Sequence, residues 1–136
     1  MRFRRIALVF VTALSVGLLP SAAQASAHQG TWRGTTAQGR GMAFRANGYE
    51  QITYLAIKIQ VEGFDCSAVI TWTFNGAAKI RADGTFTVKG MSGIDSLTVN
   101  GRFLSRFKAE GFAKSTVFDP CLGSGRTSWT ASKVVT

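Results

Sequence analysis

The sequence predicts an all-β protein, an antiparallel up-and-down meander of about eight strands that closes into a barrel. Apolar and polar residues alternate with a period of two, and no stretch follows the helical period of about 3.6 residues. Turn signals such as Asn47-Gly48 and Asp83-Gly84 recur at even spacing. A barrel and a β-sandwich both hide edge strands, and the sandwich remains the alternative. We favour the barrel because the turns are short and no long crossover is visible.

The first two strands lie within GTWRGTTAQGRGMAFRANG, residues 30–48, which Asn47-Gly48 closes. The third contains LAIKIQVE, whose apolar residues alternate from Leu55. The fourth contains CSAVITWTF, which alternates from Cys66. Ile52 and Tyr54 are out of phase with Leu55, and this predicts a β-bulge that bends the third strand.

The second half of the meander begins after Asp83-Gly84. A hairpin turn near Arg106 would set Gly101 opposite Gly111 and leave a notch, which a ring such as Phe112 or Trp129 would cover. Further turn signals lie at Asn75-Gly76, Gly90, Gly93 and Gly123–Gly125. The expected strands are 31–36, 40–46, 51–61, 65–74, 84–89, 95–103, 107–115 and 126–134, with a short extra strand near 78–81.

The first 27 residues match a secretory signal peptide. Three arginines precede the apolar run 6–19, which is too short to span a membrane stably, and A-x-A sites follow at 23–25 and 25–27. We therefore expect cleavage near residues 25–27 and a secreted barrel domain over residues 28–136, without stable membrane insertion after cleavage. Without the three arginines, 13 Lys and Arg stand against 7 Asp and Glu, a net charge of +6.

Cys66 and Cys121 are the two cysteines, and in an oxidising compartment an even count predicts one disulfide. The bond would close a loop of 55 residues. No CxxC redox motif is present, so its expected role is structural.

The residue set argues against an enzyme. His28 is the only histidine and lies at the cleavage site, so a His-assisted nucleophile and a zinc site both lack residues. No phosphate-binding or metalloprotease motif is present. Asp65 and Asp119 lie close to the cysteines and are expected to cap turns rather than form a catalytic pair or a calcium site. We expect no catalytic residue, cofactor or metal.

The aromatic residues are the candidate lining of a cavity. Trp32 and Trp129 lie on the first and last strands, which are neighbours in a closed meander, so the two indoles can meet. An eight-stranded barrel is just wide enough for side-chain filling or for one small ligand. Core packing is the competing interpretation of the same residues. The candidate cavity residues are Trp32, Phe44, Trp72, Phe74 and Trp129.

Gly30-Thr31-Trp32 resembles the G-x-W element that opens the first strand of calycin barrels, the lipocalin and avidin group. The resemblance implies that a basic residue from the far end of the barrel packs across the Trp, and Arg126 and Lys133 are the candidates. Arg33-Gly34-Thr35-Thr36 stands where avidins carry polar ligand residues, so no ligand set is implied. The whole chain also resembles small exported bacterial β-proteins.

We therefore expect a secreted, non-enzymatic binding protein. It would hold a small apolar molecule in the barrel, or an extracellular protein or anionic envelope polymer on its surface. The alternative is an extracellular inhibitor or envelope-interaction protein acting through the loop 119–125, with Asp119, Leu122 and Ser124, which the disulfide would brace. Nucleic acid is not an expected partner, because the basic residues form no stripe.

Overall fold

The computed structural model describes residues 27–119 and 121–135. All but the last residue of the expected signal peptide lies outside the described residues. The eight strands are β1 (Gly30–Thr36), β2 (Gly41–Ala46), β3 (Gln51–Gly63), β4 (Ser67–Lys79), β5 (Thr85–Ser92), β6 (Asp95–Phe103), β7 (Lys108–Val117) and β8 (Gly123–Lys133). No helix long and apolar enough to cross a membrane occurs among these described residues.

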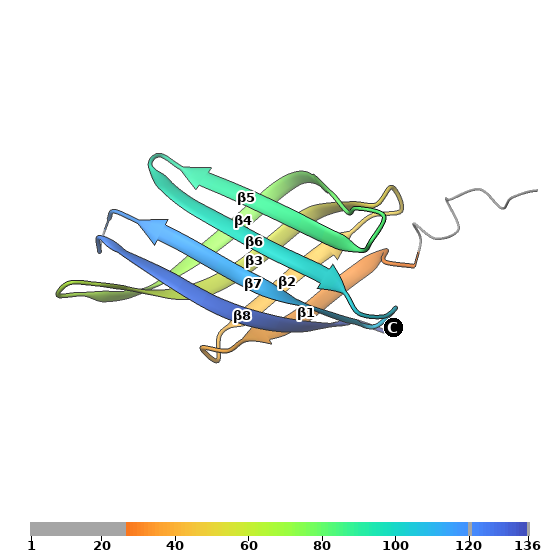
Figure 1. The fold of residues 1–136 in the computed structure, drawn as a ribbon, viewed down its shortest axis with the longest axis horizontal. Coiled ribbons are helices and arrows are strands. Elements are labelled where there is room, and N and C mark those ends of the chain that lie inside the picture. The colour runs from red at the N-terminus through yellow and green to blue at the C-terminus, as the bar shows by residue number, and fades with distance from the viewer. Residues whose placement is uncertain (1–26, 120, 136) are drawn as a thin grey trace, which may run out of the picture.

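The strands form one antiparallel sheet with the order β4-β3-β2-β1-β8-β7-β6-β5, and β1 pairs with β8. In Figure 1, β5 to β8 lie side by side on the near face and β1 to β4 lie behind them. The two ends of this order, β4 and β5, are consecutive in the chain and meet through the bridge Ile80–Phe86. The closed eight-stranded meander is therefore confirmed, and the sandwich is not observed.

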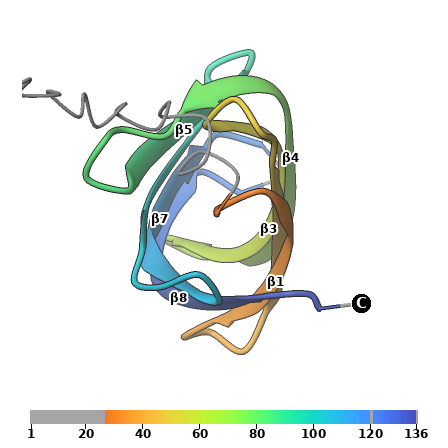
Figure 2. The ribbon, with the colours of Figure 1, turned by 90° about the vertical axis from the view of Figure 1, so that its right-hand side faces the viewer.

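The end of the β3–β4 hairpin reaches across to β8. Glu62 pairs with Ser124 and Gly63 with Gly123, and Figure 2 shows this yellow-green segment crossing the barrel. The disulfide Cys66–Cys121 lies beside this pairing, with a Cα–Cα distance of 5.8 Å, as predicted. It joins the β3–β4 hairpin to the turn between β7 and β8.

The expected bulge in the third strand is present, and it shifts the pairing with the fourth strand. The β3–β4 register changes between Ile52 and Tyr54, which pair with Ala78 and Asn75. Asn75-Gly76 makes no turn, contrary to the prediction. Its strand still has a partner in β3 down to Gln51, and the ladder continues through the Asn-Gly pair to Lys79.

Some of the other turn signals form turns, and others lie inside strands. Gly93 has a φ of +63° and forms the β5–β6 turn, and Gly84 has a φ of +81° in the turn before β5. Gly90 and Gly123–Gly125, expected as turns, lie inside strands that have partners on at least one side. The extra strand expected near 78–81 is the end of β4 followed by the Ile80 bridge.

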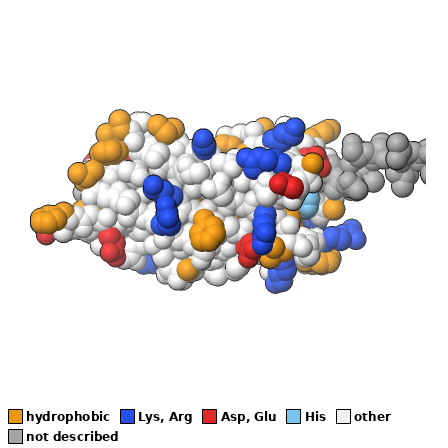
Figure 3. Space-filling model, viewed as in Figure 1, with side chains coloured by type: hydrophobic (Ala, Val, Ile, Leu, Met, Phe, Trp, Pro, Cys, Tyr) orange, Lys and Arg blue, Asp and Glu red, His pale blue; other side chains and the backbone are white. Residues whose placement is uncertain are grey.

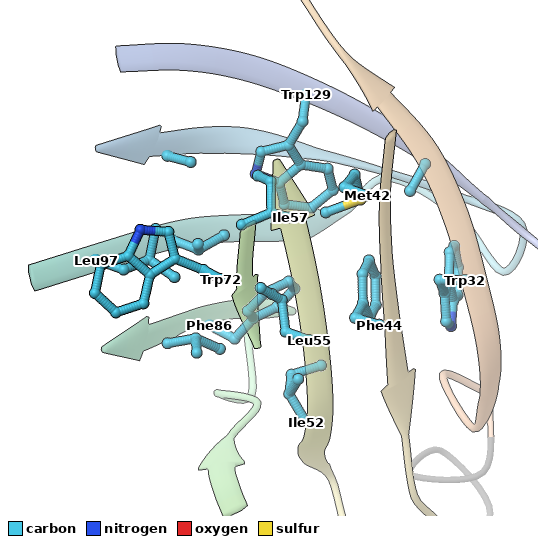
Figure 4. Close-up of a cluster of buried hydrophobic side chains, with 14 of the residues drawn as sticks. Trp32, Met42, Phe44, Ile52, Leu55, Ile57, Trp72, Phe86, Leu97 and Trp129 are labelled. Carbon is cyan, nitrogen blue, oxygen red and sulfur yellow. The ribbon is translucent and has the colours of Figure 1, made fainter. Parts of the chain in front are cut away.

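Inward side chains of all eight strands meet in one apolar core (Figure 4). The strands differ in the size of the side chains that they contribute. β7 presents only small and medium residues on its inner face, from Ala109 through Gly111, Ala113 and Ser115 to Val117. These small side chains leave room for large rings from the opposite strands. The core is therefore closely packed by small residues on one side and large residues on the other.

Candidate functional site

The centre of the barrel is occupied by aromatic rings. Trp32 and Phe44 are fully buried and stack with ring centroids 5.6 Å apart. Phe44 also packs against Trp129 at 5.8 Å, so it lies between the two indoles, which were expected to meet each other. Phe86 and Phe103 complete the cluster, with centroids 5.5 Å apart. These rings take up the space that a ligand cavity between the first and last strands would need.

The five candidate cavity residues belong to one core. Trp32, Phe44, Trp72 and Trp129 are buried in it (Figure 4), and Phe74 is partly buried and packs against it. Trp72 and Phe74 line a groove between β4 and β5. Trp129 belongs to the cluster and also forms part of the floor of a groove on the outside of the barrel.

The G-x-W element sits at the end of the barrel where the described chain begins. The Lys133 ammonium lies over the Trp32 ring, 5.9 Å from its centroid, so the basic residue implied by the calycin resemblance is Lys133. The indole Nε1 of Trp32 donates to the carbonyl of His28, and Lys133 Nζ donates to that of Ala27. The His28 ring stacks on Phe103, and burial lowers the pKa of His28, with Lys133 adding to the effect and Glu50 opposing it.

A groove of about 500 Å³ lies on the outer surface of β5 to β8. Its floor contains the edges of two buried rings, Phe86 and Trp129, and its rim is made of polar side chains. The polar and exposed residues around it are Arg81, Thr85, Thr87, Asn100, Arg102, Glu110, Phe112, Ser128 and Thr130.

A pair of glycines makes this groove. Gly101 on β6 pairs with Gly111 on β7, as predicted. A Cβ on either glycine would lie 2.7 Å from Cζ2 of Trp129, so the indole packs directly beneath both and covers the notch from inside. Nε1 of Trp129, two bonds from Cζ2, is buried and has no hydrogen-bond partner among the described residues. Phe112, the other ring considered for this role, points outward instead and is 63% exposed.

The rim of the groove is held by a polar network. Arg81 donates to the hydroxyls of Thr85 and Thr87, and Thr87 donates to the side-chain oxygen of Asn100. Across the groove, Arg102 and Glu110 form an ion pair at 2.8 Å. The hydrogen bond from the Thr85 hydroxyl lowers the pKa of the exposed Asp83 carboxyl beside Arg81.

A second hollow of about 440 Å³ lies on the other side of Phe112. It shares Asn100 and Phe112 with the first, and its rim carries Lys114 and Arg126, which are cross-strand partners. The exposed ring thus stands between two grooves that together carry four cationic side chains and one carboxylate, Glu110. Figure 3 shows this face, with Lys and Arg side chains spread along it.

Sequence reasoning missed this surface, although one signal for it was present. The stretch AEGFAK, residues 109–114, places an aromatic at an outward position between two charged ones, while the inward positions are small. The ring that this pattern places on the outer face is exposed and available for contact with a ligand.

The candidate loop 119–125 lies at the disulfide end of the barrel. Asp119 and Leu122 are exposed, and Ser124 lies in β8 opposite Glu62. Leu122 stands beside the β3–β4 turn, whose Phe64 is 98% exposed. Asp65 and Asp119 are both exposed at this end, and no group of three metal-ligating side chains occurs among the described residues.

No family model and no curated protein matches the chain. Solved structures with a similar barrel include EF1p2_mFAP2b bound to DFHBI, at 13% identity and a TM-score of 0.49, covering 83% of this chain and 97% of that one. A redesigned β-barrel, b11L5F_LGL, has 18% identity and a TM-score of 0.44, over 82% and 95% of the two chains. The S-type phycobiliprotein lyase CPES from Guillardia theta has 8% identity and a TM-score of 0.44, over 84% and 92%. These likenesses concern the fold alone.

Proposed function

We propose that this protein is an exported binding protein without catalytic activity, and that it holds an acidic polysaccharide across the outer face of β5 to β8. The observation that carries the proposal is the exposed Phe112 ring between two adjoining grooves, with Arg81 and Arg102 on one side and Lys114 and Arg126 on the other.

Each part of this surface suits a repeating acidic sugar. The apolar face of a sugar ring packs on an exposed aromatic ring, and carboxylates along the polymer pair with flanking cations. Sugar hydroxyls find partners in the hydroxyl and amide groups of the rim, among them Thr98, Asn100 and Ser128. Two adjoining grooves accept more than one repeat, which favours a polymer over a single small molecule.

Other features support binding outside the barrel and in an oxidising compartment. The aromatic cluster fills the barrel centre, which disfavours a small apolar ligand there. The disulfide is typical of exported proteins. Among the residues that line the two grooves, Glu110 is the single carboxylate and Arg102 pairs with it, whereas glycoside hydrolysis uses a pair of free carboxyl groups.

The test measures binding of the oxidised protein to polygalacturonate by titration calorimetry, with neutral dextran as the reference polymer. We expect binding to polygalacturonate only. Phe112→Ser and the double variant K114Q/R126Q should each weaken it at least tenfold.

The matched control is R33Q/K58Q, which removes two exposed cations from β1 and β3, away from the grooves. It should bind within about twofold of the parent. Charges far from the grooves attract the polymer only over long distances, and salt screens that attraction. An equal loss in this control would reduce the effect to net charge and overturn the proposal. Tighter binding to a single-stranded DNA oligonucleotide than to polygalacturonate would overturn it in favour of nucleic acid.

A further inference from the structure

The two ends of the barrel both expose large apolar side chains, but the charged residues next to those side chains differ in sign. At the disulfide end the exposed apolar residues stand among carboxylates. These are Phe64, Met91, Ile94, Phe118 and Leu122, with Glu62, Asp65, Asp95 and Asp119 in or next to the same turns. The opposite end is formed by the β2–β3, β4–β5 and β6–β7 turns and by the residues before β1 and after β8. Cations stand beside the apolar side chains of the β6–β7 turn and after β8, while the β2–β3 and β4–β5 turns carry Glu50 and Asp83.

At this second end the apolar and cationic residues alternate. Leu104 and Phe107 in the β6–β7 turn are 52% and 53% exposed, and Arg106 and Lys108 beside them are also exposed. Val135, after β8, is 76% exposed. We call the surface formed by Leu104, Arg106, Phe107, Lys108, Val134 and Val135 the basic tip.

Backbone hydrogen bonds make the basic tip one continuous surface. The amide of Lys133 donates to the carbonyl of Phe107, which joins the turn to the segment after β8. The amide of Leu104 donates to the carbonyl of Lys108, and the Ser105 hydroxyl accepts from the amides of Phe107 and Lys108. The turn is therefore held with its apolar side chains outward.

The charge of the basic tip selects its partner. Neither 104–109 nor 131–135 contains an acidic residue. The nearest carboxylate along the chain, Glu110, is paired with Arg102, and Asp83 lies next to the tip, because the amide of Phe103 donates to the carbonyl of Gly84. Figure 3 shows Lys and Arg side chains gathered at this end of the molecule, on the right of the view, with a smaller number of Asp and Glu side chains among them.

We infer that the basic tip docks on the surface of an anionic lipid bilayer. A protruding turn with apolar side chains and flanking cations has the composition of interfacial membrane contacts, in which the apolar groups enter the headgroup region and the cations pair with anionic lipids. A protein partner would need a matching concave acidic surface, whereas the lipid headgroups of a bilayer can rearrange around a convex tip. Docked by this end, the barrel stands on the membrane with Phe112 and its two grooves on its side, free to hold a polymer.

Vesicle flotation tests this inference with two lipid compositions, equimolar phosphatidylglycerol and phosphatidylcholine, and phosphatidylcholine alone. We expect the oxidised protein to float only with the anionic vesicles. L104S/F107S should lower the partition coefficient at least tenfold. R106Q/K108Q should lower it severalfold and weaken its dependence on salt.

The opposite end supplies the matched control. F64S/L122S removes two apolar residues from the disulfide end that are even more exposed than Leu104 and Phe107, and it should float like the parent protein. Circular dichroism melts establish that every variant is folded. Equal flotation with neutral vesicles, a loss in F64S/L122S as large as in L104S/F107S, or no flotation of the parent would each overturn the inference.

The groove variant K114Q/R126Q separates this inference from the proposed function. It should lose polygalacturonate binding and keep flotation, because its two cations lie outside the basic tip. If K114Q/R126Q lost flotation while L104S/F107S kept it, the groove would account for vesicle binding and the basic tip would not.

Discussion

Gly111 is the residue on which the outer groove most depends. Its position in β7 faces inward, and a Cβ there would overlap the carbonyl oxygen of Asn100 as well as Trp129. Backbone on one side and a buried indole on the other leave nothing flexible to move aside. Glycine is therefore required here because the Asn100 backbone and the Trp129 ring approach this position closely. The same close approach leaves a groove in the outer surface above Gly111.

We predict that Gly111→Ala lowers the free energy of unfolding by about 2 kcal/mol or more, in the upper part of the range for overpacking a core. Urea denaturation followed by tryptophan fluorescence measures this. Gly41→Ala is the control, since a Cβ at Gly41 meets nothing within 4 Å. A Gly111→Ala variant as stable as the control would show that β6 and β7 separate easily at this point.

At the scale of the strand, β4 is held to the barrel by unequal means on its two sides. It pairs with β3 along its whole length, but with β5 there is only the Ile80–Phe86 bridge. A side chain inside the barrel gives β4 a further attachment. Nε1 of Trp72 donates to the hydroxyl of Ser115 on β7 at 2.8 Å, across the barrel interior. Ser115 in turn donates to the carbonyl of Ser96 on β6. This buried chain of hydrogen bonds ties one end of the sheet to the opposite wall.

We predict that Ser115→Ala costs about 1–3 kcal/mol of stability, because it leaves the Trp72 N–H buried without a partner. Hydrogen exchange should show the additional opening in β4 rather than in β7. Ser128→Ala, which removes an exposed hydroxyl from β8, should change neither quantity. Uniform loss of protection over all strands would mean that the link stabilises the barrel without pinning β4.

At the scale of the whole molecule, the disulfide lies beside the strand pairing, among the described residues, that departs from the neighbour-to-neighbour order. β3 pairs with β8 only through Glu62 and Gly63, and the Cys66–Cys121 bond lies beside that pairing. A Cβ on Gly63 would overlap the carbonyl oxygen of Leu122, so the two backbones already touch there. The bond therefore stabilises a contact that requires a long loop to close.

We predict that C66A/C121A loses about 4 kcal/mol of unfolding free energy, the loop-closure value for 55 residues. Reductant should lower the melting temperature of the parent protein and leave the variant unchanged. The oxidised parent should also be lighter than its reduced form by two hydrogens. Two thiols open to alkylation in the native protein would contradict this prediction.

Features that depend on local periodicity could be predicted from the sequence. Alternation fixes which face of each strand is inward, and the phase change between Ile52 and Leu55 indicated the bulge. The register of Gly101 against Gly111 followed from a turn near Arg106, and the cysteine count identified the disulfide. Each of these is encoded within one strand, one hairpin or one pair of residues.

The filling of the barrel and the hollows of its surface depend instead on the closed tertiary structure. Whether Trp32 and Phe44 line a cavity or close it is set by the summed volume of side chains from all strands, and β7 is small inside while its partners are large. Asn75-Gly76 continues as strand because β3 still runs beside it, which the dipeptide itself cannot encode. The groove at Phe112 combines side chains of four strands with the segment before β5, so its geometry exists only after the sheet has closed.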